Sequence, residues 1–284
     1  MTQPTERYVV AGHPVEHSQS PFIHAAFARQ TGQAMAYGRL LVPLGGFAEA
    51  VRALCDGGAK GCNVTVPFKF DAFALAARHT GRATLAQAAN VLRFDTDGWL
   101  ADNTDGAGLV ADIERNAGVP VTGARVLLIG AGGAASGALG PLLAAQPGEL
   151  VIANRTLDKA RVLAERHREI APPTTLLRAT TLDGCGRDFD IVINASVSSM
   201  QGASAPVSPA VLAPGALALD MMYGPAAQPF LDWASEAGAR GRDGLGMLVE
   251  QAAAAFELWR GVRVETAPVL AALRAHMNTA GAAP

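Results

Sequence analysis

One lysine of the chain stands where its charge is locally unfavourable. The segment GCNVTVPFK (61–69) alternates like a strand, Pro67 ends that pattern, and Lys69 opens the next helix, where a positive charge opposes the helix dipole. This misfit lowers the cost of removing a proton from the amine, so Lys69 is a candidate proton carrier or hydrogen-bond donor to a substrate. A solvent-exposed structural lysine is an equally good interpretation of the segment alone.

A carboxylate further along the chain is a possible partner for this lysine. Asp105 precedes Gly106 in the segment ADNTDGAGL (101–109), where its commonest use would be to cap the following helix. The same carboxylate could instead pair with Lys69 and accept a proton. Either residue is therefore a candidate for the proton carrier.

Two serines near the N-terminus could hold an anion. Ser18 and Ser20 are two positions apart, so in an extended segment their side chains point to the same face. Pro21 restricts Ser20 to the extended region and suits the start of a helix, which makes Ser20 a natural N-cap. A helix start with two spare hydroxyls is also a good seat for a substrate carboxylate.

Two amides stand in predominantly apolar segments. Asn90, in QAANVL, leads into a strand and could bind a hydroxyl group. Gln251 lies on a mainly apolar stripe of the helical segment DGLGMLVEQAAAAFELW, whose exposed face we expect Glu250 and Glu257 to mark. An uncharged amide on a buried face needs a partner, and a ligand hydroxyl or carboxylate would serve.

A glycine-rich loop indicates a nucleotide site. GAGGAASG (130–137) begins where the apolar strand RVLLI stops and a helix starts. Gly130 and Gly132 allow a tight turn and close approach of backbone N–H groups to a pyrophosphate, and Ala135 occupies the third position of the fingerprint. The N-terminus of the helix would then present unpaired donors to the phosphates.

The end of the next strand indicates which dinucleotide binds. An NAD site usually has an acidic residue there, but this strand ends in Asn154, Arg155 and Thr156, with Lys159 one turn further on. A guanidinium, a hydroxyl and an ammonium suit a 2′-phosphate, so the sequence predicts NADP. The alternative is that both cations merely lie on a solvated helix start.

The second half of the chain alternates strictly between strands and helices. Such βαβ repetition predicts a parallel, doubly wound sheet with right-handed crossovers. The expected strands are RVLLIG, ELVIANRT, TTLLRATT, DIVINAS and LALDMMY, and the charged segment LDKARVLAERHREI is an expected helix.

The first hundred residues indicate a second α/β domain. YVVAGH, YGRLLVP and GCNVTV (61–66) are expected strands, and VLRFDTDGWLADN is an expected hairpin that turns near Asp97 and Gly98. Two late helices return to this region in our interpretation. The first domain then comprises residues 1–105 and 245–284, and residues 106–244 form the second.

Composition narrows the class of protein. Half of the 284 residues are hydrophobic and the formal net charge is −2, which suits two globular domains and gives no basic excess for nucleic acid. Without a signal-peptide pattern or a segment long enough to span a bilayer, we expect a cytoplasmic protein with no membrane contact. Three unpaired cysteines and scattered histidines predict reduced thiols and no metal site.

The chain resembles shikimate dehydrogenase almost from end to end. The matching segments occur in the family's order: GHPVEHSQSPFIH, GCNVTVPFK, AANVL, DNTDG, GAGGAA, NRT, NAS, MMYGP and DGLGMLVEQAAAAFELW. The resemblance implies an N-terminal α/β substrate domain with a mixed, mainly parallel sheet and a C-terminal Rossmann-like domain that binds NADP. It also implies reversible reduction of 3-dehydroshikimate to shikimate in aromatic amino-acid biosynthesis, by a monomer or a homodimer.

The resemblance also implies a role for each matching residue. Lys69 and Asp105 would form the catalytic pair, while Ser18 and Ser20 would hold the substrate carboxylate. The remaining substrate contacts would come from Thr65, Asn90, Asp105, Gln251 and Tyr223. The cofactor contacts would come from Gly130, Ala131, Gly132, Gly133 and Ala134 at the pyrophosphate, from Asn154, Arg155, Thr156 and Lys159 at the 2′-phosphate, and from Met221 and Gly244 beside the nicotinamide.

Three rival interpretations stay open at this point. A quinate/shikimate dehydrogenase that uses NAD would tend to carry an acidic residue near the NRT position, which is absent. Glutamyl-tRNA reductase shares the loop and the strand end but needs a cysteine thiolate, and Cys62 lies on an apolar strand face. A regulator could bind NADPH without catalysis, although the presence of Lys69 and Asp105 argues against that.

Overall fold

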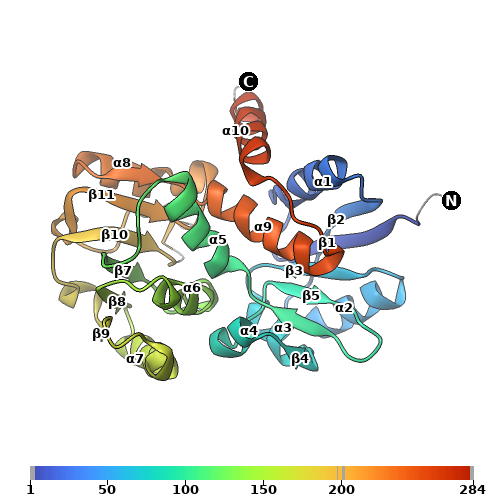
Figure 1. The fold of residues 1–284 in the computed structure, drawn as a ribbon, viewed down its shortest axis with the longest axis horizontal. Helices are drawn as coiled ribbons and strands as arrows, with labels where there is room; N and C mark the ends of the chain where they lie inside the picture. Colours follow the sequence, from blue (N-terminus) through green and yellow to red (C-terminus); the bar gives the residue numbers. More distant parts are fainter. Residues whose placement is uncertain (1–3, 197, 200–201, 282–284) are drawn as a thin grey trace. The chain divides into compact units, whose positions relative to one another are not determined.

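The chain folds into two compact units, each built around its own six-stranded sheet (Figure 1). The computed structural model describes residues 4–196, 198–199 and 202–281. The first unit comprises residues 1–108 and 248–284, and the second comprises residues 109–247. The first unit is therefore discontinuous along the chain.

The first unit contains a mixed sheet with the strand order β2-β1-β3-β5-β6-β4. β1 pairs in parallel with β2 and β3, β4 pairs in parallel with β6, and β5 runs antiparallel to both β3 and β6. The strands are β1 (Glu6–Gly12), β2 (Met35–Leu41), β3 (Gly61–Val64), β4 (Arg78–His79), β5 (Val91–Arg93) and β6 (Leu100–Asp102). The helices are α1 (Ser20–Thr31), α2 (Phe47–Asp56), α3 (Lys69–Leu75), α4 (Gly81–Ala86), α9 (Leu245–Arg260) and α10 (Thr266–Gly281).

The direction of β5 determines where polar loops gather in this unit. Because β5 is antiparallel to both of its neighbours, the residues after β3, before β5 and after β6 lie at the same edge of the sheet. Asn63 pairs with Val91, and Val91 pairs with Asp102, so the three strand ends are in register there. This edge carries the loop before Lys69, the residue Asn90 and the loop before Asp105.

The second unit is a doubly wound sheet whose strands are all parallel, in the order β12-β11-β10-β7-β8-β9. Numbered from β7, this is the order 3-2-1-4-5-6 of dinucleotide-binding folds, with its switch point between β7 and β10. The strands are β7 (Arg125–Ile129), β8 (Glu149–Ala153), β9 (Leu176–Thr180), β10 (Phe189–Asn194), β11 (Leu212–Asp220) and β12 (Arg240–Arg242). The helices are α5 (Asp105–Ala111, which begins in the first unit), the π-helical turn η1 (Asp112–Asn116), α6 (Gly133–Ala144), α7 (Leu157–His167) and α8 (Gln228–Glu236), with short 3₁₀ turns η2 (Arg168–Ile170), η3 (Leu182–Gly184), η5 (Pro209–Val211) and η6 (Gly224–Ala227).

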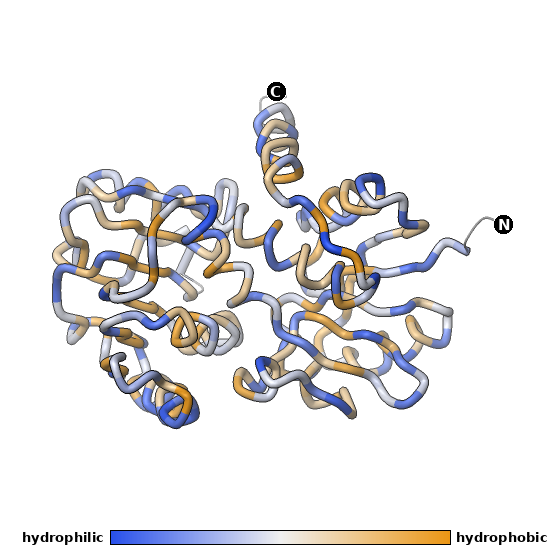
Figure 2. The backbone as a smooth tube through the Cα atoms, viewed as in Figure 1, coloured by the Kyte–Doolittle hydropathy of each residue, from blue (hydrophilic) through white to orange (hydrophobic). Residues whose placement is uncertain are grey.

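The central strands of this second sheet are buried on both faces. Val126 and Leu128 of β7 belong to one apolar cluster, and Leu127 and Ile129 belong to another. Continuous apolar runs of this kind are characteristic of parallel strands that helices cover on both sides, and they appear as orange stretches of the tube in Figure 2. The parallel sheet predicted from residue 125 onward is therefore confirmed, but strict alternation with helices is not: among the described residues only the 3₁₀ turns η3 and η5 lie between β9 and β10 and between β10 and β11.

The predicted hairpin is also present. β5 and β6 are antiparallel, and Gly98 between them has a φ of +115°, a conformation that favours glycine. Two other predictions were wrong. The strand expected over residues 61–66 ends at Val64, and Val66 is exposed rather than part of the apolar face.

The second correction concerns the long helix α9. Glu250, expected on its exposed face, is buried, and its Oε1 accepts a hydrogen bond from Thr266 Oγ1 at 2.8 Å. Thr266 is the first residue of α10, so the start of the second C-terminal helix contacts that side of the first. Glu257 is exposed as predicted.

The first unit contains a buried histidine in α1. His24 of α1 has no exposed surface, stacks on Tyr37 with ring centroids 4.2 Å apart, and contacts Asn63 Oδ1 through Nε2 at 3.2 Å. Burial lowers the pKa of His24 to about 3, although the bond to Asn63 acts in the opposite direction. His24 is therefore neutral, and Nε2 carries the proton that Asn63 Oδ1 accepts.

This histidine should make stability depend on pH. The unfolded chain takes up a proton at His24 below about pH 6.5, whereas the folded chain does so only near pH 3, so acid favours the unfolded state in that window. Between pH 6.5 and 4 this contribution should lower the free energy of unfolding by about 3 kcal/mol. His24→Gln keeps an N–H donor without a titrating group, so urea unfolding across this range should show a shallower pH dependence than wild type; equal slopes would contradict the assignment.

Candidate active site

Lys69 and Asp105 form an ion pair in the first unit. Lys69 Nζ donates to Asp105 Oδ2 at 2.5 Å, and the two side chains are only 15% and 8% exposed. Each residue is the first of its helix, α3 and α5 respectively. A carboxylate is favourable at a helix start and an ammonium is not, so the pair compensates the misfit of Lys69. The pairing predicted from the sequence is confirmed.

Asn90 is the centre of the polar cluster around this pair. Its Nδ2 lies within hydrogen-bond distance of Thr104 Oγ1 at 2.9 Å, Asp105 Oδ1 at 2.9 Å and Gln251 Oε1 at 3.0 Å. Its Oδ1 accepts the backbone N–H of Thr104 at 2.8 Å. All four residues are buried. Asn90 thus connects the carboxylate of Asp105 to the amide of Gln251, although the three residues lie far apart in sequence.

A second ion pair holds the turn that carries Asp105. Asp102 accepts two hydrogen bonds from Arg82, from Nε at 2.6 Å and Nη2 at 2.5 Å, and two more from Thr80 Oγ1 and the backbone N–H of Asn103. Burial alone raises the pKa of Asp102, but the bonds from Arg82 outweigh it and hold the pKa below its usual range. Asn103 then accepts the N–H of Asp105.

The two serines form a polar turn at the start of α1. Gln19, rather than Ser20, occupies the N-cap position, and Ser18 Oγ accepts the backbone N–H of Ser20 at 3.3 Å. The two hydroxyl oxygens are 3.1 Å apart, so they lie together as predicted, but the expected extended backbone was wrong: Gln19 has helical φ and ψ, and Ser20 is the first residue of α1. Arg39 donates to the carbonyl of Ser18 through Nε and Nη2, at 3.2 and 2.6 Å, and fixes the backbone of the turn.

A chain of hydrogen bonds connects this turn to Asn90. Tyr37 donates to Asn63 Oδ1 at 2.6 Å and shares a hydrogen bond with Ser20. Asn63 Nδ2 donates to the carbonyl of Asn90 at 3.3 Å. The serine turn and the Lys69 pair therefore belong to a single polar network in the first unit.

Two further predicted residues have simpler surroundings. Thr65 lies in the turn between β3 and α3, where its N–H bonds to Ala11 O and its carbonyl accepts from Phe68. Tyr223 lies in the second unit, immediately before η6, and is half-buried. The network described above does not include either residue.

The glycine-rich loop has the features of a phosphate cradle. Gly130 has a φ of +113°, and a Cβ there would lie 2.9 Å from Ala195 O, so this turn requires glycine. Gly132 is the N-cap residue of α6, so no side chain caps the helix, and a Cβ at Gly132 would meet nothing within 4 Å. The N–H groups of Gly133 and Ala134 therefore start a helix beside open space, where a pyrophosphate fits. Ala131 lies between the two glycines.

The end of β8 presents cationic groups to solvent. Asn154 Nδ2 donates to the carbonyl of Thr156, which shapes the turn before α7. Arg155, Thr156 and Lys159 are exposed, and across the described residues neither cation takes part in an ion pair. Free cations with no carboxylate at the strand end fit an additional phosphate group.

Met221 and Gly244 lie close together at the end of β11. A Cβ at Gly244 would lie 2.4 Å from the carbonyl of Met221, and the N–H of Gly244 donates to Met222 O at 2.8 Å. Only glycine permits this approach of two backbone segments. Both residues are thus placed at the carboxyl end of the parallel sheet, where nucleotides bind in this class of fold.

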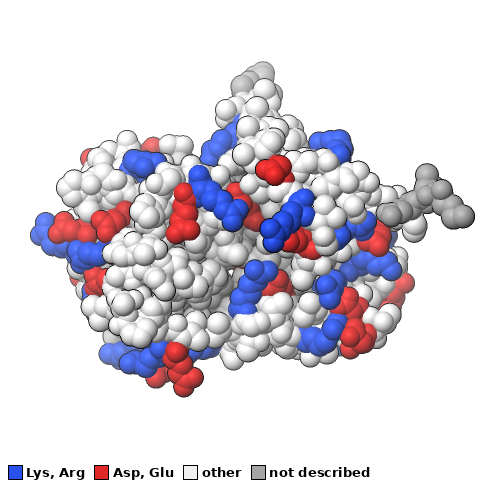
Figure 3. Space-filling view, in the orientation of Figure 1, with Lys and Arg blue, Asp and Glu red and all other residues white. Residues whose placement is uncertain are grey.

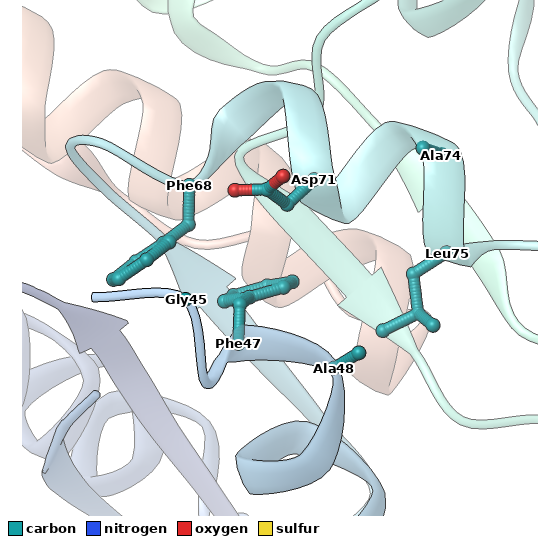
Figure 4. A pocket seen from close by; sticks show the side chains of 7 residues that line it. All are labelled: Gly45, Phe47, Ala48, Phe68, Asp71, Ala74 and Leu75. Atoms are coloured by element: carbon teal, nitrogen blue, oxygen red, sulfur yellow. The ribbon is translucent and has the colours of Figure 1, made fainter. Parts of the chain in front are cut away.

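An apolar hollow lies outside the polar network. The hollow is lined by Gly45, Phe47, Ala48, Phe68, Asp71, Ala74 and Leu75, and the rings of Phe47 and Phe68 lie 5.1 Å apart in it (Figure 4). None of its residues belongs to the polar network. On the face shown in Figure 3, Lys and Arg are interspersed with Asp and Glu. Within the described ranges there is no cluster suited to a metal ion and no helix able to cross a membrane.

The sequence reasoning missed several members of the network. Thr104, Asn103 and Asp102 stand directly beside the predicted Asp105, but nothing in their spacing showed that they would be buried and would bond to Asn90, Ala88 and Arg82 respectively. For Asn63 the sequence contained a weak indication of a place in the network, because it is a polar residue that alternates with apolar ones along a strand.

Three models of known protein families match the chain. The shikimate dehydrogenase substrate binding domain matches residues 10–92. The shikimate/quinate 5-dehydrogenase model matches residues 113–203, and the shikimate 5′-dehydrogenase C-terminal domain matches residues 244–274. The matches thus fall in both units.

Individual relatives are similar over nearly the whole chain. The shikimate dehydrogenase (NADP(+)) of Methylibium petroleiphilum is 63% identical over 277 residues, which are 95% of this chain and 94% of that protein. An Ael1 enzyme from Pseudomonas putida is 46% identical, with a TM-score of 0.86 over 94% of this chain and 98% of that one. The shikimate 5-dehydrogenase of Thermus thermophilus, solved with NADP(H) and shikimate, is 28% identical with a TM-score of 0.82 over 95% of this chain and 98% of that one.

The Arg82–Asp102 pair should make a measurable contribution to stability. Asp102→Asn removes the charge and turns an NH₂ group toward the guanidinium, so the free energy of unfolding should fall by about 2 kcal/mol. This loss is smaller than that expected for a fully buried ion pair, because Arg82 is 36% exposed. The pKa of Asp102 is lower in the folded than in the unfolded chain. The difference in stability between wild type and variant should therefore be fully present above pH 3.8 and disappear in stronger acid. Urea unfolding measures it, with exposed Asp97→Asn as the matched control; equal losses for both variants would contradict the prediction.

Proposed function

The chain belongs to the shikimate dehydrogenase family, and we propose that its Lys69–Asp105 pair carries the proton in the reversible, NADP-dependent reduction of 3-dehydroshikimate to shikimate. The enzyme is an NADP-dependent oxidoreductase of aromatic amino-acid biosynthesis, on the path to chorismate. The observation that carries the proton assignment is the buried contact between Lys69 Nζ and Asp105, beside the amides of Asn90 and Gln251.

The substrate is a hydroxylated ring that bears a carboxylate, and the network offers groups for both features. We assign the carboxylate to the hydroxyls of Ser18 and Ser20, which share one face of the turn. The ring hydroxyls are assigned to Thr65, Asn90 and Gln251 in the first unit. Asp105 also binds the substrate in this proposal, and Tyr223 supplies a further contact.

The chemistry follows from the donors of Lys69. One of its three N–H groups bonds to Asp105, which leaves two for substrate oxygens. During reduction, Lys69 donates a proton to the ketone oxygen as that oxygen gains negative charge, and during oxidation the amine takes the hydroxyl proton back. Asp105 accepts a hydrogen bond from the ammonium and orients it. NADPH, when bound, supplies the hydride.

The residues of the second unit fit this cofactor. Gly130, Ala131, Gly132, Gly133 and Ala134 would hold the pyrophosphate, since the glycine turn leaves open space before an uncapped helix. The cofactor's 2′-phosphate would be held by Asn154, Arg155, Thr156 and Lys159. Met221 and Gly244 would contact the nicotinamide.

This proposal extends to domain roles and setting. Residues 1–105 and 245–284 form the substrate domain, and residues 106–244 form the NADP domain. The protein acts in the cytoplasm as a monomer or homodimer, in keeping with its three free cysteines. Parallel absorbance assays with shikimate and quinate, each with NADP and NAD, test the function: preference for quinate or NAD would overturn the substrate or cofactor assignment.

Removing the Lys69 amine should abolish most turnover. General acid–base catalysis contributes about 10²- to 10⁴-fold to rate, so Lys69→Met should lower kcat with shikimate by a factor in this range. The dissociation constant for NADPH should stay within about twofold, because Lys69 belongs to the other unit. The exposed Lys60→Met is the control and should keep wild-type kcat. Near-wild-type turnover of Lys69→Met would refute its role, and Asp105→Asn then tests the remaining candidate.

Arg155 should decide between the two dinucleotides. A hydrogen bond to a charged group contributes about 1.5–3 kcal/mol, so Arg155→Ala should reduce kcat/KM for NADP by about 10- to 100-fold and leave that for NAD unchanged. Arg161→Ala alters an arginine of the following helix α7 that pairs with Asp158, and should change neither value. Equal losses with both cofactors would show that Arg155 does not bind the 2′-phosphate.

A further inference from the structure

A carboxylate outside the described sites is buried without a counter-ion. Asp220, the last residue of β11, has no exposed surface and forms no ion pair with any residue that the structure describes. Burial raises the pKa of its carboxyl group, and hydrogen bonds from Ser199 and Met222 act in the opposite direction. A charge buried in this way is costly unless its hydrogen bonds are complete.

The hydrogen bonds of Asp220 come from two different strand ends. Oδ1 accepts the backbone N–H of Met222 at 2.8 Å. Oδ2 accepts from Asn194 Nδ2 at 3.0 Å and from the hydroxyl of Ser199. Asn194 is the last residue of β10, so one carboxylate ties the segment after β10 to the segment after β11.

The carboxylate also determines which way its partners point. Asn194 Oδ1 already accepts the N–H and the hydroxyl of Ser196, at 3.1 and 2.7 Å, so its Nδ2 must face Asp220. Both oxygens of Asp220 therefore meet N–H donors. An asparagine in its place cannot satisfy both, because its own NH₂ group would face either Asn194 or Met222.

The clamped segments belong to the half of the fold that receives the second nucleotide. In the order 3-2-1-4-5-6 the first three strands, β7 to β9, bind one mononucleotide, and the strands corresponding to β10 to β12 bind the other. Gly130 and Arg155 lie in the first half. Met221, between Asp220 and Met222, packs against Gly244 in the second.

We propose that Asp220 is a positioning residue for the nicotinamide half of the cofactor. It acts through the Met221–Met222 backbone and through Asn194 and Ser199, rather than through the residues assigned to the adenosine half. This inference rests on the proposed use of NADP, with the adenosine end on β7 and β8. Loss of the Asp220 carboxylate should weaken binding of the whole dinucleotide without weakening binding of a fragment that lacks nicotinamide.

The test compares two ligands on two variants of the full chain. Asp220→Asn should raise the dissociation constant for NADPH by about tenfold and leave that for adenosine 2′,5′-bisphosphate within twofold. Ser199→Ala removes one donor and preserves the carboxylate, so it should raise the NADPH constant by about threefold, again without effect on the bisphosphate. Asp232→Asn, an exposed carboxylate of α8 in the same unit, is the matched control.

Each outcome separates this role from a structural one. Loss of affinity for both ligands in parallel, in either variant, would show that Asp220 only stabilises the unit and would overturn the inference. Unchanged NADPH binding in both variants would also overturn it. A wild-type protein that binds neither ligand would overturn the cofactor assignment, and this inference with it.

Discussion

The geometry of the first unit follows from one requirement, that an ammonium and a carboxylate 36 positions apart meet in a nearly dry site. Lys69 follows β3 and Asp105 follows β6, and these strands are not neighbours. β5 lies between them and runs antiparallel to both, so its first residues reach the same edge as the ends of the other two. Asn90, which precedes β5, therefore lies between the two loops and fills the space beside the pair with an amide.

The polar groups around this pair are tolerated because their hydrogen bonds are made. Asn63 illustrates the principle: its amide nitrogen donates to the carbonyl of Asn90, and its oxygen accepts from Tyr37 and from neutral His24. A buried network of this kind is stable when complete and costly when one member is removed. Its rigidity serves catalysis, since side chains held by several partners need little reorganisation when charge develops on a substrate.

The sequence predicted the parts of the fold in which local pattern and burial agree. The apolar runs of the second sheet, the hairpin at Gly98 and the glycine turn at Gly130 have local causes, and the structure contains all three. The pairing of Lys69 with Asp105 was one of the alternatives that the sequence offered, because Lys69 stands where its charge opposes the helix dipole. The buried position of Glu250 was not predictable, since its partner Thr266 is the first residue of α10, which the helical pattern of α9 does not reveal. Asp220 was missed for a similar reason: its three donors come from segments that only the sheet order brings together.

The discontinuity of the first unit bears on how the protein is made. Gln251 and Trp259 come from its C-terminal part, and they bond to Asn90 and to the carbonyl of Leu92, more than 160 positions earlier. The second unit, by contrast, is one uninterrupted stretch of chain. During translation, that stretch can leave the ribosome and complete its sheet while the first unit still lacks two helices. Vectorial synthesis thus delivers a finished nucleotide fold before the proton-transfer site has all its residues, and premature termination before residue 248 would leave β5 without the amide and the indole that cover it.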